Sequence, residues 1–152
     1  TSFFNTTFTN YEMIASENNR VFRFENRIHR TIVTDQLLLK QLMTILFDNA
    51  VKYTEEDGEI DFLISATDRN LYLLVSDNGI GISTEDKKKI FDRFYRVDKA
   101  RTRQKGGFGL GLSLAKQIVD ALKGTVTVKD NKPKGTIFEV KIAIQTPSKK
   151  KK

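Results

Sequence analysis

The chain has 152 residues, of which 39% are hydrophobic and 30% charged, so it can form one compact domain with its own core. It has no cysteine and no run of about 18 apolar residues, which excludes a disulfide framework, a thiolate metal site and a membrane-spanning helix. The net charge of +7 would suit a nucleic-acid-binding protein, but the lysines at 149–152 supply four of these charges, so we predict no nucleic-acid partner.

The chain opens at Thr1 without a methionine, and we interpret it as a fragment of a longer protein. Residues 1–146 are predicted to form a single domain. Residues 147–152 are predicted to be a disordered basic tail, because a run of like charges without large apolar side chains cannot build a core. The lack of cysteine is compatible with a reducing cytoplasm.

The first third of the chain predicts two helices and a strand pair. Residues 5–19 have the spacing of a modest helix, and residues 21–24 alternate like a short strand with its hairpin partner at 27–33. Asp35 is the expected N-cap of a long helix that runs to about Thr54. The residues that recur at three- and four-residue spacing and share one face of this helix are Leu38, Leu42, Ile45, Leu46 and Asn49.

The middle of the chain predicts a hairpin followed by a short helix. Residues 55–58 form a turn, after which the segments 60–66 and 71–76 have the patterns of strands. Their short connection predicts an antiparallel pair. Residues 83–94 are expected to form a short helix that begins at its serine.

The last third predicts a helix and a second hairpin. The helix is expected at 112–123, closed by Gly124 at its C′ position, and the strands at 125–129 and 136–144 flank a turn at 131–135. Most strands therefore lie in adjacent hairpins with three substantial helices between them. This order predicts an α+β fold, a two-layer α/β sandwich with helices on one face of a mixed, mainly antiparallel sheet.

The end of the long helix is the first of four segments that suggest chemistry. Asn49, Lys52 and Tyr53 are three and four residues apart, so an amide oxygen, an ammonium and an aromatic ring point the same way. These groups suit a metal ion, a phosphate and a nucleotide base respectively. An amphipathic last turn without any function would have the same pattern.

The second segment follows a strand that ends at Asp77. Gly79 and Gly81 allow a ligand to approach the backbone closely, and Ile82 completes the segment. The Asp77 carboxylate only accepts hydrogen bonds, so it could receive one from an adenine amino group. An ordinary strand-to-helix turn is the alternative interpretation.

The third segment, residues 91–98, alternates aromatic residues with Arg93 and Arg96, which suits a lid that packs at one end and meets phosphate at the other. A helix end anchored in the core with arginines on its surface would look similar. We expect residues 98–108 to be a mobile lid, because they are polar and bounded by glycines.

The fourth segment, residues 106–112, opens into a helix. Backbone amides of a glycine loop at a helix N-terminus form an anion site. The spacing of Gly107, Gly109 and Gly111 fits neither a Walker A motif nor a dinucleotide-binding fingerprint. A glycine cluster alone is a weak signal, whereas all four segments in this order are a strong one.

Together these segments resemble the N, G1, F and G2 boxes of the histidine-kinase catalytic domain, a member of the Bergerat-fold ATPases. The match covers about residues 35–144, and the run at 94–98 is typical of sensor kinases. The resemblance implies ATP and Mg²⁺ as cofactors, with Asn49 as metal ligand and Lys52 and Arg96 at the phosphates. The further nucleotide contacts that it implies are Tyr53, Asp77, Gly79, Gly81, Ile82, Arg93, Gly107, Gly109, Leu110, Gly111 and Leu112.

The family resemblance also implies a reaction and its partners. The γ-phosphate of ATP would pass to a histidine on a separate dimerisation domain, and from there to a response regulator. The parent protein would be a membrane-anchored homodimer with this domain in the cytoplasm, and the isolated domain a monomer. His29, the only histidine, lacks the sequence context of the family's phosphorylated histidine and is interpreted as a surface hairpin residue.

One position departs from the family. Ile45 stands where the family usually has another Asn and where hydrolytic relatives have a Glu that activates water. Isoleucine can do neither, which favours transfer to a protein. A serine kinase or ATP hydrolase of the same superfamily is the alternative, and a non-catalytic nucleic-acid-binding module is a more distant one.

Overall fold

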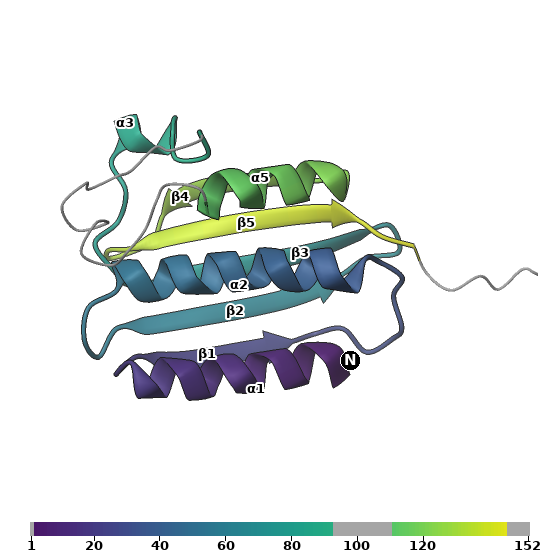
Figure 1. Cartoon of the computed structure of the whole chain (residues 1–152), viewed down its shortest axis with the longest axis horizontal. Coiled ribbons are helices and arrows are strands. Elements are labelled where there is room, and N and C mark those ends of the chain that lie inside the picture. Colours follow the sequence, from purple (N-terminus) through teal and green to yellow (C-terminus); the bar gives the residue numbers. More distant parts are fainter. Residues whose placement is uncertain (1, 93–110, 146–152) are drawn as a thin grey trace, which may run out of the picture.

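The computed structural model describes residues 2–92 and 111–145. Figure 1 shows their arrangement along the chain. The elements are α1 (Ser2–Glu17), β1 (Val21–Asn26), α2 (Gln36–Tyr53), β2 (Glu59–Ala66), β3 (Asn70–Asp77), α3 (Thr84–Lys87), α5 (Gly111–Ala121), β4 (Thr125–Asp130) and β5 (Thr136–Ala143).

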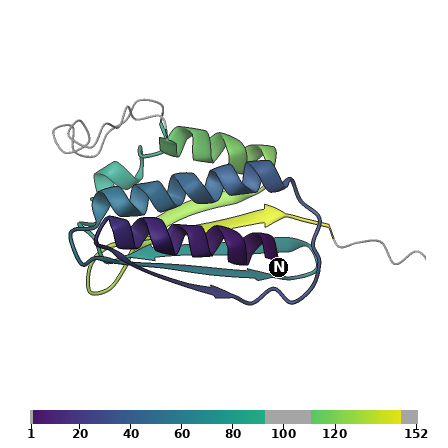
Figure 2. The ribbon, with the colours of Figure 1, turned by 60° about the horizontal axis from the view of Figure 1, so that its bottom comes forward.

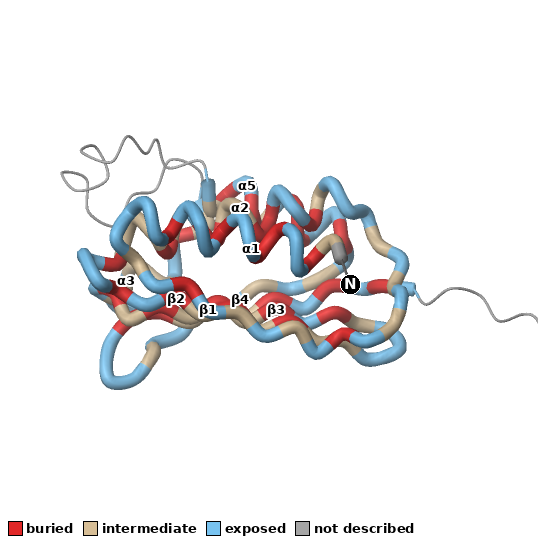
Figure 3. The backbone as a smooth tube through the Cα atoms, turned by 90° about the horizontal axis from the view of Figure 1, so that it is seen from below, coloured by how far each residue is buried: buried red, intermediate tan, exposed pale blue. Residues whose placement is uncertain are grey.

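The strands form one sheet in the order β1-β2-β3-β5-β4. The β1–β2 pair is parallel, and the other three pairs are antiparallel. Helices α1, α2 and α5 cover one face of this sheet, as Figures 2 and 3 show, and the opposite face is open. The predicted fold class, an α+β sandwich with a mainly antiparallel sheet, is confirmed.

The core lies between the helices and the sheet and is rich in aromatic rings near α1. Phe8 and Tyr11 of α1 meet Phe22 and Phe47, and the rings of Tyr11 and Phe47 stack with centroids 4.4 Å apart. The Tyr11 hydroxyl lies 2.7 Å from the hydroxyl of Thr44 on α2. Burial raises the pKa of Tyr11 to about 12. Aromatic packing therefore fixes α1 to both α2 and the sheet.

The predicted hairpin partner of β1 is wrong. Strand β1 pairs in parallel with β2, and helix α2 makes the crossover between them. The chain leaves β1 in a turn in which the Asn26 side chain accepts a hydrogen bond of 2.9 Å from the amide of Ile28. Ile28 is buried and Ile32 half-buried, so the apolar alternation that suggested a strand belongs to a loop anchored in the core. Within it, only Val33 forms an isolated bridge, with Gln145.

Helix α2 begins where the sequence predicts. The Asp35 carboxylate accepts a hydrogen bond of 3.0 Å from the Leu38 amide, which confirms it as the N-cap. The C-cap is Thr54, whose amide donates to the Ala50 carbonyl. Ile45 packs against the core as a half-buried residue. The fully buried face of the helix consists of Leu39, Leu42, Met43, Leu46, Phe47 and Ala50.

Two predicted helix ends need correction. Ser83 caps α3 as expected, but the helix ends at Lys87, much earlier than the predicted residue 94. At the end of α5, the left-handed C′ residue is Lys123 with φ of 59°, and Gly124 is the next residue, whose amide donates to the Val119 carbonyl. Glycine is required at 124 for another reason, since a Cβ there would lie 2.0 Å from the Lys141 carbonyl oxygen.

Candidate nucleotide-binding site

Asp77, at the end of β3, is the centre of the candidate site. It is 3% exposed, and its Oδ1 accepts hydrogen bonds from the backbone amides of Gly79 at 2.9 Å and Thr136 at 3.2 Å. Burial raises the pKa of Asp77 to about 6, although both amide hydrogen bonds act to lower it. No ion pair reaches this carboxylate from the described residues. Both amides donate to Oδ1, which leaves the acceptor capacity of Oδ2 for a ligand.

The loop after Asp77 is fixed to the end of α2. The Ile80 amide donates to the Tyr53 carbonyl at 3.0 Å. A Cβ on Gly79 would lie 2.0 Å from that same carbonyl oxygen, so only glycine lets the loop approach α2. Gly81 has φ of 79°, a left-handed conformation that favours glycine. The two glycines of this segment therefore serve the packing and the turn of the loop itself.

The three polar residues predicted at the end of α2 lie at the same end of the fold as Asp77. Asn49, Lys52 and Tyr53 all belong to α2 and are half-buried. The contacts of Gly79 and Ile80 with the Tyr53 carbonyl join this last turn directly to the Asp77 loop. Two of the four predicted segments are thus brought together.

The start of α5 carries the last two residues of the fourth segment, 106–112, to the same end of the fold. Gly111 is exposed and Leu112 half-buried, and a Cβ built on Gly111 would lie 3.7 Å from Cγ2 of Ile45. Figure 1 shows that α5 begins at the same end of the sheet as the end of α2. The remaining predicted contacts, Arg93, Arg96, Gly107, Gly109 and Leu110, and the lid expected at 98–108, lie outside the described residues.

The residues present suit a magnesium ion that arrives with a nucleotide. Within residues 2–92 and 111–145, no three His, Asp or Glu side chains form a group that could hold a metal ion. Asn49 offers one amide oxygen, and Lys52, one helical turn away, offers positive charge for phosphate. Mg²⁺ in nucleotide sites typically takes about one or two protein ligands and completes its shell with phosphate oxygens and water. One amide oxygen fits that pattern.

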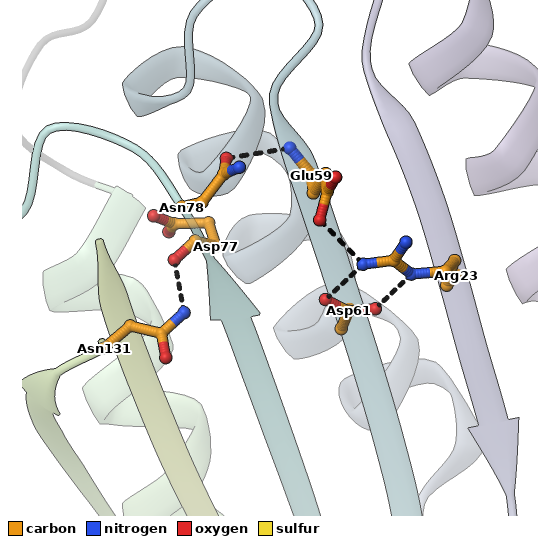
Figure 4. A network of polar contacts seen from close by, with 6 residues as sticks. All are labelled: Arg23, Glu59, Asp61, Asp77, Asn78 and Asn131. Atoms are coloured by element: carbon orange, nitrogen blue, oxygen red, sulfur yellow. Dashed lines mark hydrogen bonds and ion pairs between the residues drawn. The ribbon is translucent and has the colours of Figure 1, made fainter. Parts of the chain in front are cut away.

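The connection between β4 and β5 contributes contacts that the sequence analysis missed. Asn131 Nδ2 donates to the Asp77 carbonyl at 2.8 Å, as Figure 4 shows. A cavity of about 670 Å³ separates the loop at 80–83 from the residues at 130–135. A second cavity, of about 470 Å³, lies on the open face of the sheet, where Glu59 and Asp61 of β2 line it. Asp61 pairs in register with Ser76, so its side chain is on the face opposite the Asp77 carboxylate. The Gly-Thr pair at 135–136 was a sequence signal for one end of this connection, since its threonine begins β5 and pairs with Asp77.

The sequence matches the family described as histidine kinase-, DNA gyrase B-, and HSP90-like ATPase over residues 34–146. The chain belongs to this ATPase family. Within it, the resemblance to histidine kinases is confirmed by the sensor histidine kinase WalK of Bacillus subtilis (strain 168), which is 46% identical over 104 residues. That match covers 67% of this chain and 17% of WalK, so the chain spans only a small part of the curated relatives it matches.

Solved structures of histidine kinases share the fold of this ATPase domain. The nucleotide-free catalytic domain of ThkA has a TM-score of 0.79 at 26% identity, over 96% of this chain and 94% of that one. Full-length ShkA in complex with AMPPNP has a TM-score of 0.81 at 25% identity, over 97% of this chain and 30% of ShkA. ThkA has also been solved in complex with the response regulator protein TrrA. In the described residues of the present chain, no helix is long and apolar enough to cross a membrane.

Proposed function

We propose that this ATPase-family domain is the catalytic part of a sensor histidine kinase, which binds MgATP and transfers the γ-phosphate to a histidine on a separate dimerisation domain. The observation that carries the proposal is Asp77, a buried carboxylate without a cation partner among the described residues. Burying a carboxylate without a cation is unfavourable, and groups perturbed in this way gather at functional sites. Membership of the ATPase family supports ATP as that ligand.

In this proposal each part of the site has one task. The Asp77 carboxylate accepts a hydrogen bond from the adenine amino group, and Tyr53 packs beside the base. Gly79, Gly81 and Ile82 form the adjoining loop, while Gly111 and Leu112 begin the helix that faces the phosphates. Asn49 would hold Mg²⁺ and Lys52 a phosphate. When bound, the metal ion would supply positive charge that neutralises the phosphates.

The environment of Ile45 supports transfer to a protein over hydrolysis. Its side chain is half-buried against the core and borders the start of α5 at Gly111. No general base can act from this position, so water lacks the activation that a carboxylate would give. Transfer to an oriented acceptor depends instead on positioning, which can contribute about 7–11 kcal/mol to lowering the barrier.

The acceptor is proposed to lie outside this chain. His29 is exposed in the loop after β1, at the end of the sheet opposite Asp77, which supports the prediction that it is a surface residue without a catalytic role. The proposed partners are a dimerisation domain that carries the acceptor histidine and, through it, a response regulator. We propose that residues 1–146 act as a monomeric cytoplasmic domain with a basic tail at 147–152, in a membrane-anchored homodimeric parent.

A thermal-shift titration tests the nucleotide site. ATP and ADP with Mg²⁺ should raise the melting temperature, because a ligand that binds only the native state stabilises it by about 2.7 kcal/mol at a hundredfold excess over Kd. GTP should raise it much less, since guanine has a carbonyl where adenine has its amino group. Equal shifts with ATP and GTP would contradict the role of Asp77.

A labelling experiment tests the reaction. The chain is mixed with labelled ATP, with and without a purified dimerisation domain that carries the acceptor histidine. We expect acid-labile, base-stable label on that domain and none on the chain alone. Acid-stable label on Ser or Thr, or rapid hydrolysis of ATP by the chain alone, would favour the serine kinase or hydrolase.

A further inference from the structure

Asn131 occupies a defined position between β4 and the carbonyl group of Asp77. Its Nδ2 donates to the Asp77 carbonyl at 2.8 Å, as Figure 4 shows, and its Oδ1 accepts from the Lys132 amide at 2.9 Å. Its own amide donates to the Gly135 carbonyl at 3.0 Å. The side chain is half-buried and uses both ends of its carboxamide. A single rotamer is therefore held in place on the Asp77 peptide group.

The other end of the same connection also contacts Asp77. Gly135 has φ of 110°, and a Cβ there would lie 1.9 Å from the Asp77 carbonyl oxygen and 2.8 Å from the Asn78 Cα. The next residue, Thr136, donates its amide to the Asp77 carboxylate at 3.2 Å. Residues 131–136 thus contact both the main-chain carbonyl and the side-chain carboxylate of Asp77.

Asp77 is fixed from the opposite side by the loop attached to α2, through the Gly79 amide. Two amide donors consequently set the direction of its carboxylate, while a hydrogen bond from the Asn131 side chain sets the orientation of its main-chain carbonyl. Hydrogen bonds prefer angles above about 150° and weaken steeply below about 120°. A small rotation of the Asp77 peptide would therefore weaken a hydrogen bond from Oδ2 to a ligand without unfolding the domain.

From these contacts we propose that Asn131 is a positioning residue for adenine recognition: its carboxamide holds the Asp77 main chain so that the carboxylate faces the base. The proposal rests on the proposed function of Asp77. It adds a residue outside the four segments that suggested nucleotide binding. Because Asn131 acts through Asp77, its loss should reduce the affinity for adenine nucleotides selectively.

The test uses the whole chain and three variants. Asn131→Asp keeps the size of the side chain and the acceptor for the Lys132 amide but removes the donor to Asp77. Asn131→Ala removes the same donor without adding charge. The matched control is Lys129→Ala, which changes the net charge by the same amount as Asn131→Asp and removes an exposed ion pair with Glu139.

Isothermal titration with MgATP and with MgGTP gives the Kd of each nucleotide and the fraction of competent protein. We expect both Asn131 variants to lose about tenfold in ATP affinity, equivalent to about 1.4 kcal/mol, while their weak affinity for GTP stays unchanged. The preference for ATP over GTP therefore falls. Lys129→Ala should keep the preference of the wild type.

Comparing the Kd values of the two nucleotides distinguishes a positioning role of Asn131 from a general effect on folding. Partial unfolding lowers the fraction of competent protein and leaves the ratio of the two Kd values unchanged. A wild-type ratio in Asn131→Ala, or in Asn131→Asp, would overturn the inference about Asn131. If the wild type itself binds ATP no better than GTP, the proposed role of Asp77 fails first.

Discussion

Carboxylates at the ends of β2 and β3 have different kinds of hydrogen-bond partner, and Figure 4 shows Arg23 between Glu59 and Asp61. Glu59 and Asp61 are about half exposed and both pair with Arg23, at 2.9 and 2.8 Å. These hydrogen bonds and charges raise the pKa of Arg23 further above its ordinary value. Asp77 is 3% exposed and has only backbone amides around its carboxylate in the described part of the chain.

Solvent and an ion pair compensate the charges of Glu59 and Asp61, whereas the charge of Asp77 has no cation partner in the described residues. An exposed ion pair typically contributes about 0–1 kcal/mol to stability, so the Arg23 cluster needs no functional explanation. A buried carboxylate without a cation destabilises the domain at neutral pH. Perturbed groups of this kind gather at functional sites, which makes Asp77 the better indicator of function.

The strongest test of this contrast replaces each acid with its amide. Asp77→Asn keeps one oxygen for the two backbone amides but presents a donor where the ligand needs an acceptor. It should cost about 1.5–3 kcal/mol of binding free energy for MgATP, or roughly 10- to 150-fold in Kd, as measured by isothermal titration. Asp61→Asn is the matched control and should bind ATP normally. Wild-type affinity in a folded Asp77→Asn protein would remove Asp77 from the site.

The pH dependence of stability gives a second test of similar size. The pKa of Asp77 is about 6 in the folded protein, against an ordinary value of 3.8 for an exposed aspartate. At pH values between these two pKa values, the folded state therefore binds more protons than the unfolded state. The contribution of Asp77 to stability is fully present below the unfolded-state pKa and is lost as the pH rises through the folded-state pKa. The two pKa units correspond to about 3 kcal/mol.

Denaturant unfolding of the nucleotide-free chain between pH 4 and pH 8 measures this effect. The difference in unfolding free energy between Asp77→Asn and wild type should grow in favour of the variant as pH rises, and reach its maximum above pH 7. The same difference for Asp61→Asn should stay nearly constant. ATP affinity of the wild type should rise over the same interval, because a hydrogen bond from the ligand favours the charged carboxylate. A pH-independent difference for Asp77→Asn would mean that its pKa is ordinary.

Local sequence signals predicted the elements whose stabilising contacts lie nearby in the chain. Asp35 caps α2 by a contact three residues away, and Ser83 caps α3 in the same manner. Two of the failures involve partners that are distant in sequence. Residues 27–33 alternate like a strand, yet β1 pairs with β2 across an intervening helix. Gly124 looked like a helix C′ residue, but its absent Cβ makes room for Lys141.

In the candidate site, too, contacts between neighbours in sequence could be predicted and contacts between distant residues could not. Its two groups of residues on continuous segments, the end of α2 and the loop after Asp77, could be predicted from spacing and glycine content. Asn131 could not, because its contact with Asp77 spans 54 residues and arises only when β5 pairs with β3. A lone Asn in a turn is otherwise ordinary turn chemistry.

Tyr11→Phe extends the comparison to a buried polar group that is neutral and has a partner. Its hydroxyl lies 2.7 Å from the Thr44 hydroxyl, so the variant removes one hydrogen bond and leaves the ring stacked on Phe47. We expect a loss of about 1 kcal/mol in unfolding free energy, with ATP affinity unchanged. Thr44→Val and the double variant complete a cycle that isolates the pair. Equal effects of Tyr11→Phe in the presence and absence of the Thr44 hydroxyl would show that the two groups do not interact.

The smallest effect is expected from Arg23→Ala, which leaves Glu59 and Asp61 without their cation. Both acids remain hydrated, since their side chains are 48% and 47% exposed, so no buried charge results. The loss should be about 0.2–1 kcal/mol and should shrink in 1 M salt, where the Debye length falls to about 3 Å. ATP affinity should not change, because the cluster lies on the open face of the sheet. A loss above about 2 kcal/mol that persists in high salt, or a weaker Kd for ATP, would show that the two groups of carboxylates are coupled. The contrast between a satisfied and an unsatisfied charge would then no longer distinguish the functional site.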